Sequence, residues 1–314
     1  MDSIKSERSD VIKTGNDEFV HYVLTPVNGP PVEYYISQPR APAPLVIYLQ
    51  GSGCTPVFPP SGFGKDHAST VFSSTTMART YPVTVMVINK PYVPVRAPRD
   101  GGIATNCPKE FNDYFSLESW VSHIETAYAH ALKQPWVDSR KTLVIGVSEG
   151  ATVAAVLAAR EPRITDVALV GGSGPTQLYD FIAGAYASSP DQINVLAALG
   201  DLELKRTAIA SAPQDSTRFA WGHSYKRWSS FFASSSVENL TKSAANIYVV
   251  SGMADTAVPI LSTEVLYAEL IRKGRNITMR RIPGGNHALT REDASINEVE
   301  GEYDRIVRWY LHIQ

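Results

Sequence analysis

The sequence predicts an α/β protein whose central sheet is mostly parallel and is flanked by helices. The first observation is a short, continuous apolar run at Leu45–Leu49, which is typical of a strand buried on both faces. Runs of the same kind recur at Val83–Ile88, Thr142–Ile145, Val167–Val170 and Ile247–Val250. The second observation is that helix-type patterns separate these runs. Strands that alternate with helices form a parallel sheet covered on both faces.

The other elements follow from their local patterns. Phe19–Leu24 and Val32–Ile36 are expected to be strands on either side of a turn rich in Pro and Gly. Ile277–Ile282 is expected to be a further strand with a more polar pattern. Apolar residues spaced three to four apart predict helices. The expected helices are residues 117–132, Glu149–Arg160, Ile260–Arg272 and residues 296–310.

The predicted organisation is one core with one insertion. Residues 1–17 are polar and are expected to form a loose N-terminal tail. Residues 18–174 and 244–314 are expected to form the core. Residues 175–243 separate two core strands by far more than one crossover helix requires, and they are rich in aromatic residues. Because so long a connection is usually structured and functional, we expect a helical cap there.

Composition and charge exclude several classes of protein. The chain has 314 residues, of which 44% are hydrophobic, and its net charge is −2. No basic excess is present to hold a polyanion, so nucleic acid is not an expected partner. No apolar run is long enough for a membrane span. The polar N-terminus has no apolar segment of the signal-peptide type, which predicts a cytoplasmic protein. The sequence does not indicate an oligomeric state.

The clearest chemical signal is Gly146–Gly150, with the sequence GVSEG. It lies between a predicted strand and a predicted helix, and this arrangement around G-x-S-x-G is a nucleophile elbow, which exposes a serine Oγ above the sheet. Glycines are needed because Cβ atoms would clash in so tight a turn. The helix N-terminus offers N–H groups to developing negative charge. The segment therefore predicts Ser148 as a nucleophile.

A serine nucleophile needs a base, and the base needs an acid that orients it. Among the seven histidines, His287 lies in a glycine-rich loop between the last predicted strand and the last predicted helix. Asp255 lies just past the end of the Ile247–Val250 strand. The chain order serine, acid, histidine is that of elbow-type hydrolases. We therefore predict Ser148, Asp255 and His287 as the catalytic residues.

These segments together resemble the α/β-hydrolase superfamily. The resemblance rests on the Gly146–Gly150 elbow, the Gly252–Pro259 segment, the Gly285–His287 loop and Gln50–Gly53, where the family often has His-Gly. It covers roughly residues 19–314, and residues 175–243 correspond to the variable cap. It implies the α/β-hydrolase fold, a Ser-Asp-His triad and no cofactor.

The resemblance also implies an oxyanion hole made by the backbone N–H groups of Ser52 and Glu149, with Gly53 as the alternative to Ser52. Gly51 and Gly53 would let the backbone approach the substrate closely. Losing one such donor typically costs about 3–4 kcal/mol of transition-state stabilisation. No HExxH or CxxC pattern is present, so no metal site is expected.

Four charged or sulfur-bearing positions leave alternatives open. The Glu149 carboxylate is expected to complement the helix dipole, and contact with a substrate amine or a cap residue is the alternative. Arg227 in the cap is expected to be a solvated surface charge, and attraction of an anionic substrate is the alternative. Cys54 and Cys107 are expected to be free, buried thiols. The alternative is a Cys54–Cys107 disulfide, because the two loops that carry these cysteines could meet.

The expected function is that of a carboxylesterase, which cleaves a small carboxylic ester through an acyl-enzyme on Ser148. The alternatives are a serine peptidase of the aminopeptidase or oligopeptidase type and a non-catalytic, ligand-binding homologue. The expected partner is a small-molecule ester or a short peptide. The sequence does not specify the acyl group or the leaving group.

Overall fold

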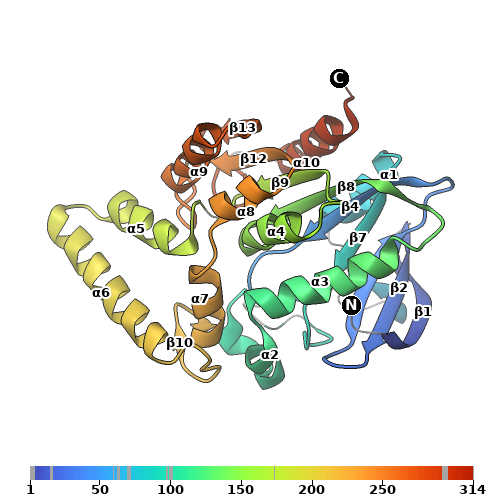
Figure 1. Cartoon of the computed structure of the whole chain (residues 1–314), viewed down its shortest axis with the longest axis horizontal. Helices are drawn as coiled ribbons and strands as arrows, with labels where there is room; N and C mark the ends of the chain where they lie inside the picture. The colour runs from blue at the N-terminus through green and yellow to red at the C-terminus, as the bar shows by residue number, and fades with distance from the viewer. Residues whose placement is uncertain are drawn as a thin grey trace.

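The centre of the computed structural model is a twisted sheet, with helices on both of its faces (Figure 1). The structure describes residues 4–14, 17–58, 60–61, 64–68, 72–96, 98, 102–172, 174–291 and 296–313, without the side chains of 60–61, 64–68, 72–74 and 296–299. Within this part of the chain the sheet has 11 strands. They are β1 (Ile4–Thr14), β2 (Asp17–Pro26), β3 (Val32–Ser37), β4 (Ala43–Leu49), β5 (Pro60–Ser61), β6 (Gly64–Ala68), β7 (Thr84–Ile88), β8 (Val137–Val147), β9 (Asp166–Val170), β12 (Asn246–Gly252) and β13 (Ile277–Ile282).

The helices and one small hairpin complete the described chain. The hairpin is β10 (Phe219–Ala220) with β11 (His223–Ser224), and a short 3-10 turn, η1 (Ala104–Asn106), precedes the second helix. The helices are α1 (Phe72–Thr80), α2 (Lys109–Tyr114), α3 (Leu117–Ala131), α4 (Glu149–Arg160), α5 (Gln177–Ser188), α6 (Gln192–Ser211), α7 (Tyr225–Phe232), α8 (Ser236–Lys242), α9 (Ile260–Arg272) and α10 (Ile296–Leu311). No helix in the described ranges is both long and apolar enough to cross a membrane.

The sheet has a parallel part and an antiparallel part. The strand order is β13-β12-β9-β8-β4-β7-β3-β2-β1-β6-β5. All neighbours from β13 to β7 pair in parallel, and β3, β2 and β1 continue the sheet in antiparallel pairs. Ile47 in the centre of β4 lies opposite Met86 of β7 and Val144 of β8. The continuous apolar runs are therefore the central parallel strands, and the predicted fold class of a mostly parallel sheet flanked by helices is confirmed.

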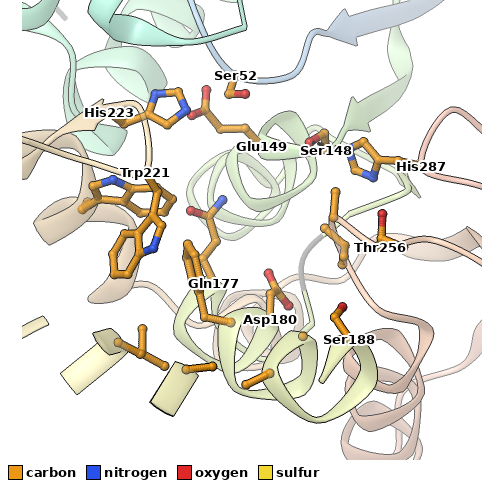
Figure 2. Close-up of a pocket in the computed structure, with 18 of the residues that line it drawn as sticks. Ser52, Ser148, Glu149, Gln177, Asp180, Ser188, Trp221, His223, Thr256 and His287 are labelled. Carbon is orange, nitrogen blue, oxygen red and sulfur yellow. Dashed lines mark hydrogen bonds between the residues drawn. The ribbon is translucent and has the colours of Figure 1, made fainter. Parts of the chain in front are cut away.

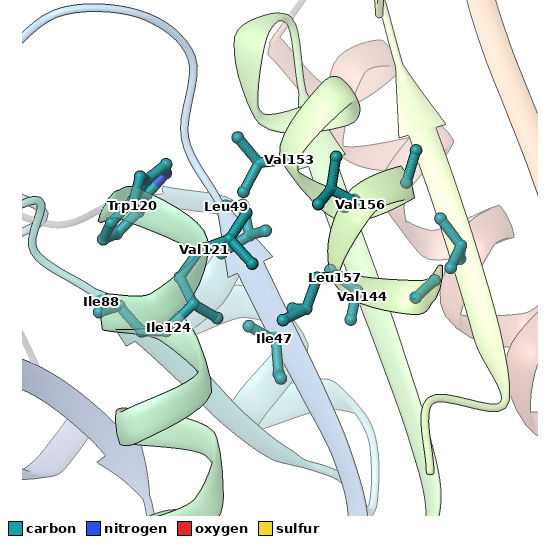
Figure 3. Close-up of a cluster of buried hydrophobic side chains, with 14 of the residues drawn as sticks. Ile47, Leu49, Ile88, Trp120, Val121, Ile124, Val144, Val153, Val156 and Leu157 are labelled. Atoms are coloured by element: carbon teal, nitrogen blue, oxygen red, sulfur yellow. The ribbon is translucent and has the colours of Figure 1, made fainter. Parts of the chain in front are cut away.

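Two apolar layers hold the helices on the sheet. On one face, α3, α4, α8 and α9 contribute to a large core cluster, part of which Figure 3 shows between α3, α4 and the sheet. Trp120 and Leu157 are fully buried in this cluster. On the other face, α1 and α10 pack through residues such as Met77 and Ile306. Replacing a buried side chain of this size with alanine typically costs about 3–5 kcal/mol, so both faces stabilise the sheet that carries the site.

The prediction of a loose tail at residues 1–17 is wrong for its described part. Ile4–Thr14 forms β1, which pairs with β2 from Ile4 opposite Pro26 to Thr14 opposite Asp17. Most side chains of β1 are exposed, and only Ile12 and Thr14 are buried. An exposed strand needs no apolar alternation, because backbone hydrogen bonds pair it with its neighbour even where its side chains face solvent. The polar sequence therefore concealed it.

The connection between β9 and β12 holds α5, α6, the β10–β11 hairpin, α7 and α8. In Figure 1, α5 and α6 extend away from the sheet, and α7 lies between them and the core. The last helix, α8, belongs to the core instead. It packs on α4, and its Val237 and Leu240 are buried in the main cluster. The predicted boundary at residue 243 is therefore too late, since α8 is an ordinary crossover helix. We call the segment from α5 to α7 the helical insertion.

Candidate active site

The turn between β8 and α4 holds Ser148 in a strained backbone conformation. Its φ is 55° and its ψ is −120°. The flanking glycines explain how the chain tolerates this turn. A Cβ on Gly146 would lie 2.2 Å from Gly150 O, and one on Gly150 would lie 2.5 Å from Leu49 O. The turn thus requires glycine on both sides, as an elbow that presents a serine does.

The structure brings the three predicted catalytic side chains into one hydrogen-bonded chain. Ser148 Oγ lies 3.0 Å from His287 Nε2, and His287 Nδ1 lies 2.8 Å from Asp255 Oδ2. A carboxylate only accepts hydrogen bonds, so Nδ1 carries the proton in this pair. In the neutral ring Nε2 is then free to accept the serine proton. The arrangement can therefore make Ser148 a nucleophile, with His287 as its base.

Asp255 is fixed from both sides. Its side chain is fully buried, and Oδ1 accepts backbone N–H groups of Ala257 at 2.8 Å and Val258 at 2.9 Å. This leaves Oδ2 for the histidine. The loop of His287 packs tightly on the end of β12, since a Cβ on Gly252 would lie 2.2 Å from Gly285 O. Close packing of these two loops sets the distance between acid and base.

The predicted oxyanion donors lie beside the nucleophile. Among the described residues, no acceptor pairs with the backbone N–H of Ser52 or of Glu149. A Cβ on Gly51 would lie 3.3 Å from the Cβ of Ser148, so this loop approaches the elbow closely. Gln50, where the resembling family often has histidine, donates Nε2–H to Thr55 O at 2.9 Å and closes the loop. Gly53 has a φ of +86°, which favours glycine.

Three buried charged residues next to the elbow form a network. No sequence signal predicts the role of Lys90, and contact of Glu149 with a cap residue is expected from the sequence only as an alternative. Lys90 Nζ lies 2.7 Å from Glu149 Oε1, and Arg227 Nη2 lies 2.7 Å from Glu149 Oε2. Their side chains are only 0%, 2% and 4% exposed for Lys90, Glu149 and Arg227. The expectation that Arg227 is a solvated charge is wrong, and Glu149 contacts a residue of the insertion. We call these three residues the charge network.

Burial and pairing shift the pKa values around the charge network. Burial would raise the pKa of Glu149, but the nearby Lys90 and Arg227 outweigh it and lower this pKa to about 2. Burial lowers the pKa of Lys90, because desolvation of the ammonium outweighs its attraction to Glu149. Burial and the adjacent Arg227 also lower the pKa of His223 to about 3. His223, which lines the same pocket, is therefore neutral near pH 7.

A pocket of about 520 Å³ opens over Ser148, between the core and the helical insertion. Phe181, Trp221 and Trp228 form one side of it, which we call the aromatic wall. The rings of Phe181 and Trp221 lie 4.4 Å apart, and those of Trp221 and Trp228 lie 5.6 Å apart. Figure 2 shows Trp221 on the opposite side of the pocket from His287, with Gln177 reaching into the space between. Among the described residues, Gln177 Oε1 has no hydrogen-bond partner.

The β10–β11 turn places Trp221 on this wall at a conformational cost. Trp221 has a φ of 45° and the next residue, Gly222, a φ of 78°. Two successive positive φ values match a type I′ hairpin turn. In a residue with a side chain, this conformation costs about 1–2 kcal/mol. Gly222 is required there, because a Cβ would lie 2.6 Å from Ile103 Cγ2.

A disulfide bond joins Cys54 to Cys107. The expectation of two free thiols is therefore wrong, and the alternative pairing is present. Cys54 follows the Gly51–Gly53 loop, and Cys107 follows η1. The bond ties the loop with the proposed oxyanion donor Ser52 to the long connection between β7 and α3.

A family match covers the C-terminal third of the chain. The model of the prolyl oligopeptidase family matches residues 206–312. This range contains Asp255 and His287 but begins after Ser148. No curated protein sequence matches the chain significantly.

Many solved structures share the fold at low sequence identity. An acetyl xylan esterase from Paenibacillus sp. R4 has a TM-score of 0.62 and 12% sequence identity. The match covers 99% of this chain and 90% of the esterase chain. Est1E from Butyrivibrio proteoclasticus has a TM-score of 0.56 and 15% sequence identity, and the match covers 97% of this chain and 99% of Est1E. A structure of Est1E with ferulic acid bound has also been solved.

A longer relative of the same fold is a peptidase. Dipeptidyl peptidase 4 from Porphyromonas gingivalis has a TM-score of 0.56 and 14% identity, with 97% of this chain covered. This chain spans only 36% of that peptidase. Together these similarities confirm the α/β-hydrolase fold for the chain.

Proposed function

We propose that this chain is a serine hydrolase that cleaves a carboxylic ester through an acyl-enzyme on Ser148. The observation that carries the proposal is the hydrogen-bonded chain from Ser148 through His287 to Asp255, at 3.0 and 2.8 Å, beside two backbone N–H groups without an acceptor in the described residues. The matches to esterases and to the prolyl oligopeptidase family support serine hydrolase chemistry in general.

The proposed reaction has two halves. Ser148 Oγ attacks the ester carbonyl carbon while its proton moves to His287 Nε2, and the carbonyl electron pair moves onto oxygen. The N–H groups of Ser52 and Glu149 bind this oxyanion. The electron pair then returns, the alkoxide leaves, and it takes the proton from Nε2. Water repeats the same steps on the acyl-enzyme and releases the acid, while Asp255 stabilises the imidazolium in both halves.

The pocket favours a substrate with a sizeable apolar group. A volume of about 520 Å³ is within the range of small-molecule sites, which is roughly 300–1,000 Å³. The aromatic wall offers ring edges and faces to a planar group, for which edge-to-face contacts contribute about 0.5–1.5 kcal/mol. The unpartnered Gln177 Oε1 can accept a hydrogen bond from a polar substituent. We therefore propose an ester with an aromatic group, a substrate larger than an acetyl ester of a small alcohol.

The charges in the pocket favour an ester over a peptide with a free amino terminus. A substrate ammonium needs an unpaired carboxylate. Two of the three described carboxylates that line the pocket are paired with cations, Glu149 with Lys90 and Arg227, and Asp201 with Lys205. The third, Asp180, accepts the backbone N–H of Gly174. Peptide hydrolysis remains the second candidate because of the match to the prolyl oligopeptidase family.

A hydrolysis panel tests both candidates. It comprises p-nitrophenyl esters from acetate to decanoate, p-nitrophenyl phenylpropanoate, and aminoacyl and prolyl p-nitroanilides. We expect ester turnover, highest with the aromatic acyl group, and a loss of at least about 1,000-fold in Ser148→Ala with unchanged circular dichroism. Anilide turnover equal to ester turnover would favour the peptidase. Ester turnover that persists in Ser148→Ala would refute the proposed mechanism.

A further inference from the structure

We infer that Lys90 positions the oxyanion hole, and that the charge network links this hole to the helical insertion. The inference rests on the proposed function, because it assigns a role to the two proposed oxyanion donors. Lys90 lies just past β7 and is separated in sequence from Gly51 by 39 residues and from Glu149 by 59. It does not touch the nucleophile, so it is a positioning residue.

All three N–H donors of the Lys90 ammonium can be matched to acceptors next to the elbow. Nζ lies 2.7 Å from Gly51 O, 3.1 Å from Gly53 O and 2.7 Å from Glu149 Oε1. A lysine ammonium has three donors and no acceptor. Because the side chain is fully buried, no solvent competes for these bonds. This single group therefore holds the oxyanion loop and the first residue of α4 together.

Peptide geometry converts the bond at Gly51 O into an orientation of the Ser52 N–H. Gly51 O and the Ser52 N–H belong to one planar peptide unit, and no described peptide bond is cis. In a trans unit the C=O and N–H point in opposite directions. Lys90 holds Gly51 O on its own side, so the Ser52 N–H must point to the other side. There it has no acceptor in the described chain and is available to a substrate oxygen.

The loop needs such a support because glycines flank Ser52. Gly51 and Gly53 lack Cβ atoms, so their backbones have more accessible conformations than those of other residues. An oxyanion hole accelerates a reaction only when its donors are already in place before charge develops. The Lys90 bonds on both sides of Ser52 supply this preorganisation.

Arg227 extends the network to α7. Its Nε and Nη2 lie 2.9 and 2.7 Å from Glu149 Oε2. Its guanidinium carbon lies 4.0 Å from the ring centre of Trp228 and 4.2 Å from that of Phe231. Glu149 thus contacts Lys90 with one oxygen and α7 with the other. A displacement of α7 would pull on the residue that supplies the second oxyanion N–H.

The test compares two inhibitors in wild type and Lys90→Met. Ser148 Oγ attacks the carbonyl carbon of benzyl trifluoromethyl ketone while the serine proton moves to His287. The carbonyl oxygen of the adduct then carries the negative charge of an oxyanion. The corresponding secondary alcohol occupies the pocket without forming one. We expect Lys90→Met to weaken the binding affinity of the ketone by about 100-fold, which is the effect of losing one N–H donor of the oxyanion hole. We expect kcat to fall by a similar factor, with KM and alcohol binding nearly unchanged.

Lys141→Met is the matched control. Lys141 Nζ also donates to a backbone carbonyl, Tyr310 O, at 2.6 Å. Both ammonium groups lie near an aromatic ring, since Lys141 Nζ is 4.8 Å from the ring centre of Tyr310 and Lys90 Nζ is 4.9 Å from the ring centre of Phe115. It is remote from the pocket, so it should leave both inhibitors unaffected. If Lys90→Met loses ketone and alcohol affinity equally, or loses neither, Lys90 does not position the hole.

A triple variant keeps the test decisive if Lys90→Met does not fold. K90M/E149Q/R227M removes all three members of the charge network, so no buried charge loses its partner. Selective loss of ketone affinity in the triple variant relative to E149Q/R227M supports the inference, and unchanged selectivity overturns it. A wild-type protein that hydrolyses no ester and forms no ketone adduct would refute the proposed function itself. If the wild-type protein hydrolyses esters and forms the ketone adduct, and the Lys90 variant binds the ketone as tightly as the wild type does, only the role of Lys90 is refuted.

Discussion

Of the five described non-glycine residues with positive φ, two line the pocket, Ser148 and Trp221. Such residues cost of order 1–3 kcal/mol each and persist only where the surroundings enforce them. At Ser148 the backbone is enforced by the close backbone contacts of Gly146 and Gly150. At Trp221 it is enforced by the close contact of Gly222 with Ile103. The backbone is thus strained at the proposed nucleophile and at the wall that faces it.

At Asp255, exchange of one oxygen for an amide tests the proposed role of the acid. In Asp255→Asn the Oδ1 contacts with Ala257 and Val258 can persist, but the amide that replaces Oδ2 no longer favours a proton on Nδ1 of His287. The ring then adopts the wrong tautomer to accept the serine proton. We expect kcat to fall by about 10,000-fold with little change in melting temperature. A fall of less than about 10-fold would exclude Asp255 as the acid that orients His287.

At the scale of elements, the contact of α4 with β4 decides how closely the elbow approaches the oxyanion loop. A Cβ on Gly150 would lie 2.5 Å from Leu49 O and 2.8 Å from Gln50 O, and neither backbone atom can move alone. We expect Gly150→Ala to lower the free energy of unfolding by about 2–3 kcal/mol and to reduce ester turnover. Urea unfolding and the p-nitrophenyl assay measure the two effects.

Gly200 provides the matched control for this glycine. It lies in α6, is exposed, and a Cβ there would meet nothing within 4 Å. Gly200→Ala should therefore raise the free energy of unfolding by about 0.5–1 kcal/mol, because alanine favours the helix, and leave turnover unchanged. If both variants stabilise the protein, the tight contact at Gly150 is not a constraint.

A second element-scale feature is the attachment of β1 to the sheet. His21 on β2 lies 2.7 Å from Asp10 on β1 and 2.7 Å from Glu33 on β3. Burial opposes the charged ring, but Glu33 and Asp10 outweigh it and raise the pKa of His21 above 6.5. Burial likewise opposes the charged Glu33, yet the bonds from His21 and Asn89 lower its pKa below 4.5. Both groups are therefore charged together over a wide range of mildly acidic pH.

The pKa directions set the pH window in which His21 stabilises the fold. A raised folded-state pKa means that its contribution is full below about pH 6.5 and is lost as pH rises through the folded-state value. The contribution of Glu33 is present above about pH 4.5 and is lost as pH falls. We expect His21→Gln to lower the melting temperature by about 2–4 °C more near pH 5.5 than near pH 8.5. Equal effects at both pH values, measured by calorimetry, would contradict this linkage.

For the whole molecule, the disulfide connects three parts of the site. It joins the oxyanion loop to the segment of η1, and Thr105 of η1 donates its N–H to Gly222 O in the insertion at 3.2 Å. Core, long connection and insertion are thereby linked around one pocket.

Reduction of this bond should destabilise the protein. It closes a loop with a sequence separation of 53 residues. The chain-entropy argument gives a stabilisation of about 4 kcal/mol for a loop of this length. We expect dithiothreitol to lower the wild-type melting temperature and to leave that of C54S/C107S unchanged. Equal sensitivity of both proteins would show that the reagent acts elsewhere.

Features that depend on neighbours along the chain could be predicted from the residues alone. Continuous apolar runs predicted the central strands, because a strand buried on both faces needs apolar side chains at every position. The glycine pattern around Ser148 predicted the elbow, and the chain order pointed to Asp255 and His287. These signals are local, since each arises from a turn or a strand of a few residues.

Features that depend on residues far apart along the chain became visible only in the folded protein. β1 is held on β2 by backbone pairing, by the contact of Asp10 with His21 and by the burial of Ile12, and these features do not produce an alternating apolar pattern along the strand. Lys90 meets Glu149 across 59 residues, and Arg227 meets Glu149 across 78. A lysine or arginine on the surface and one buried in an ion pair have the same local sequence pattern. These charges meet behind the proposed oxyanion hole only when the chain folds. They pair there because a buried charge without a partner would be destabilising.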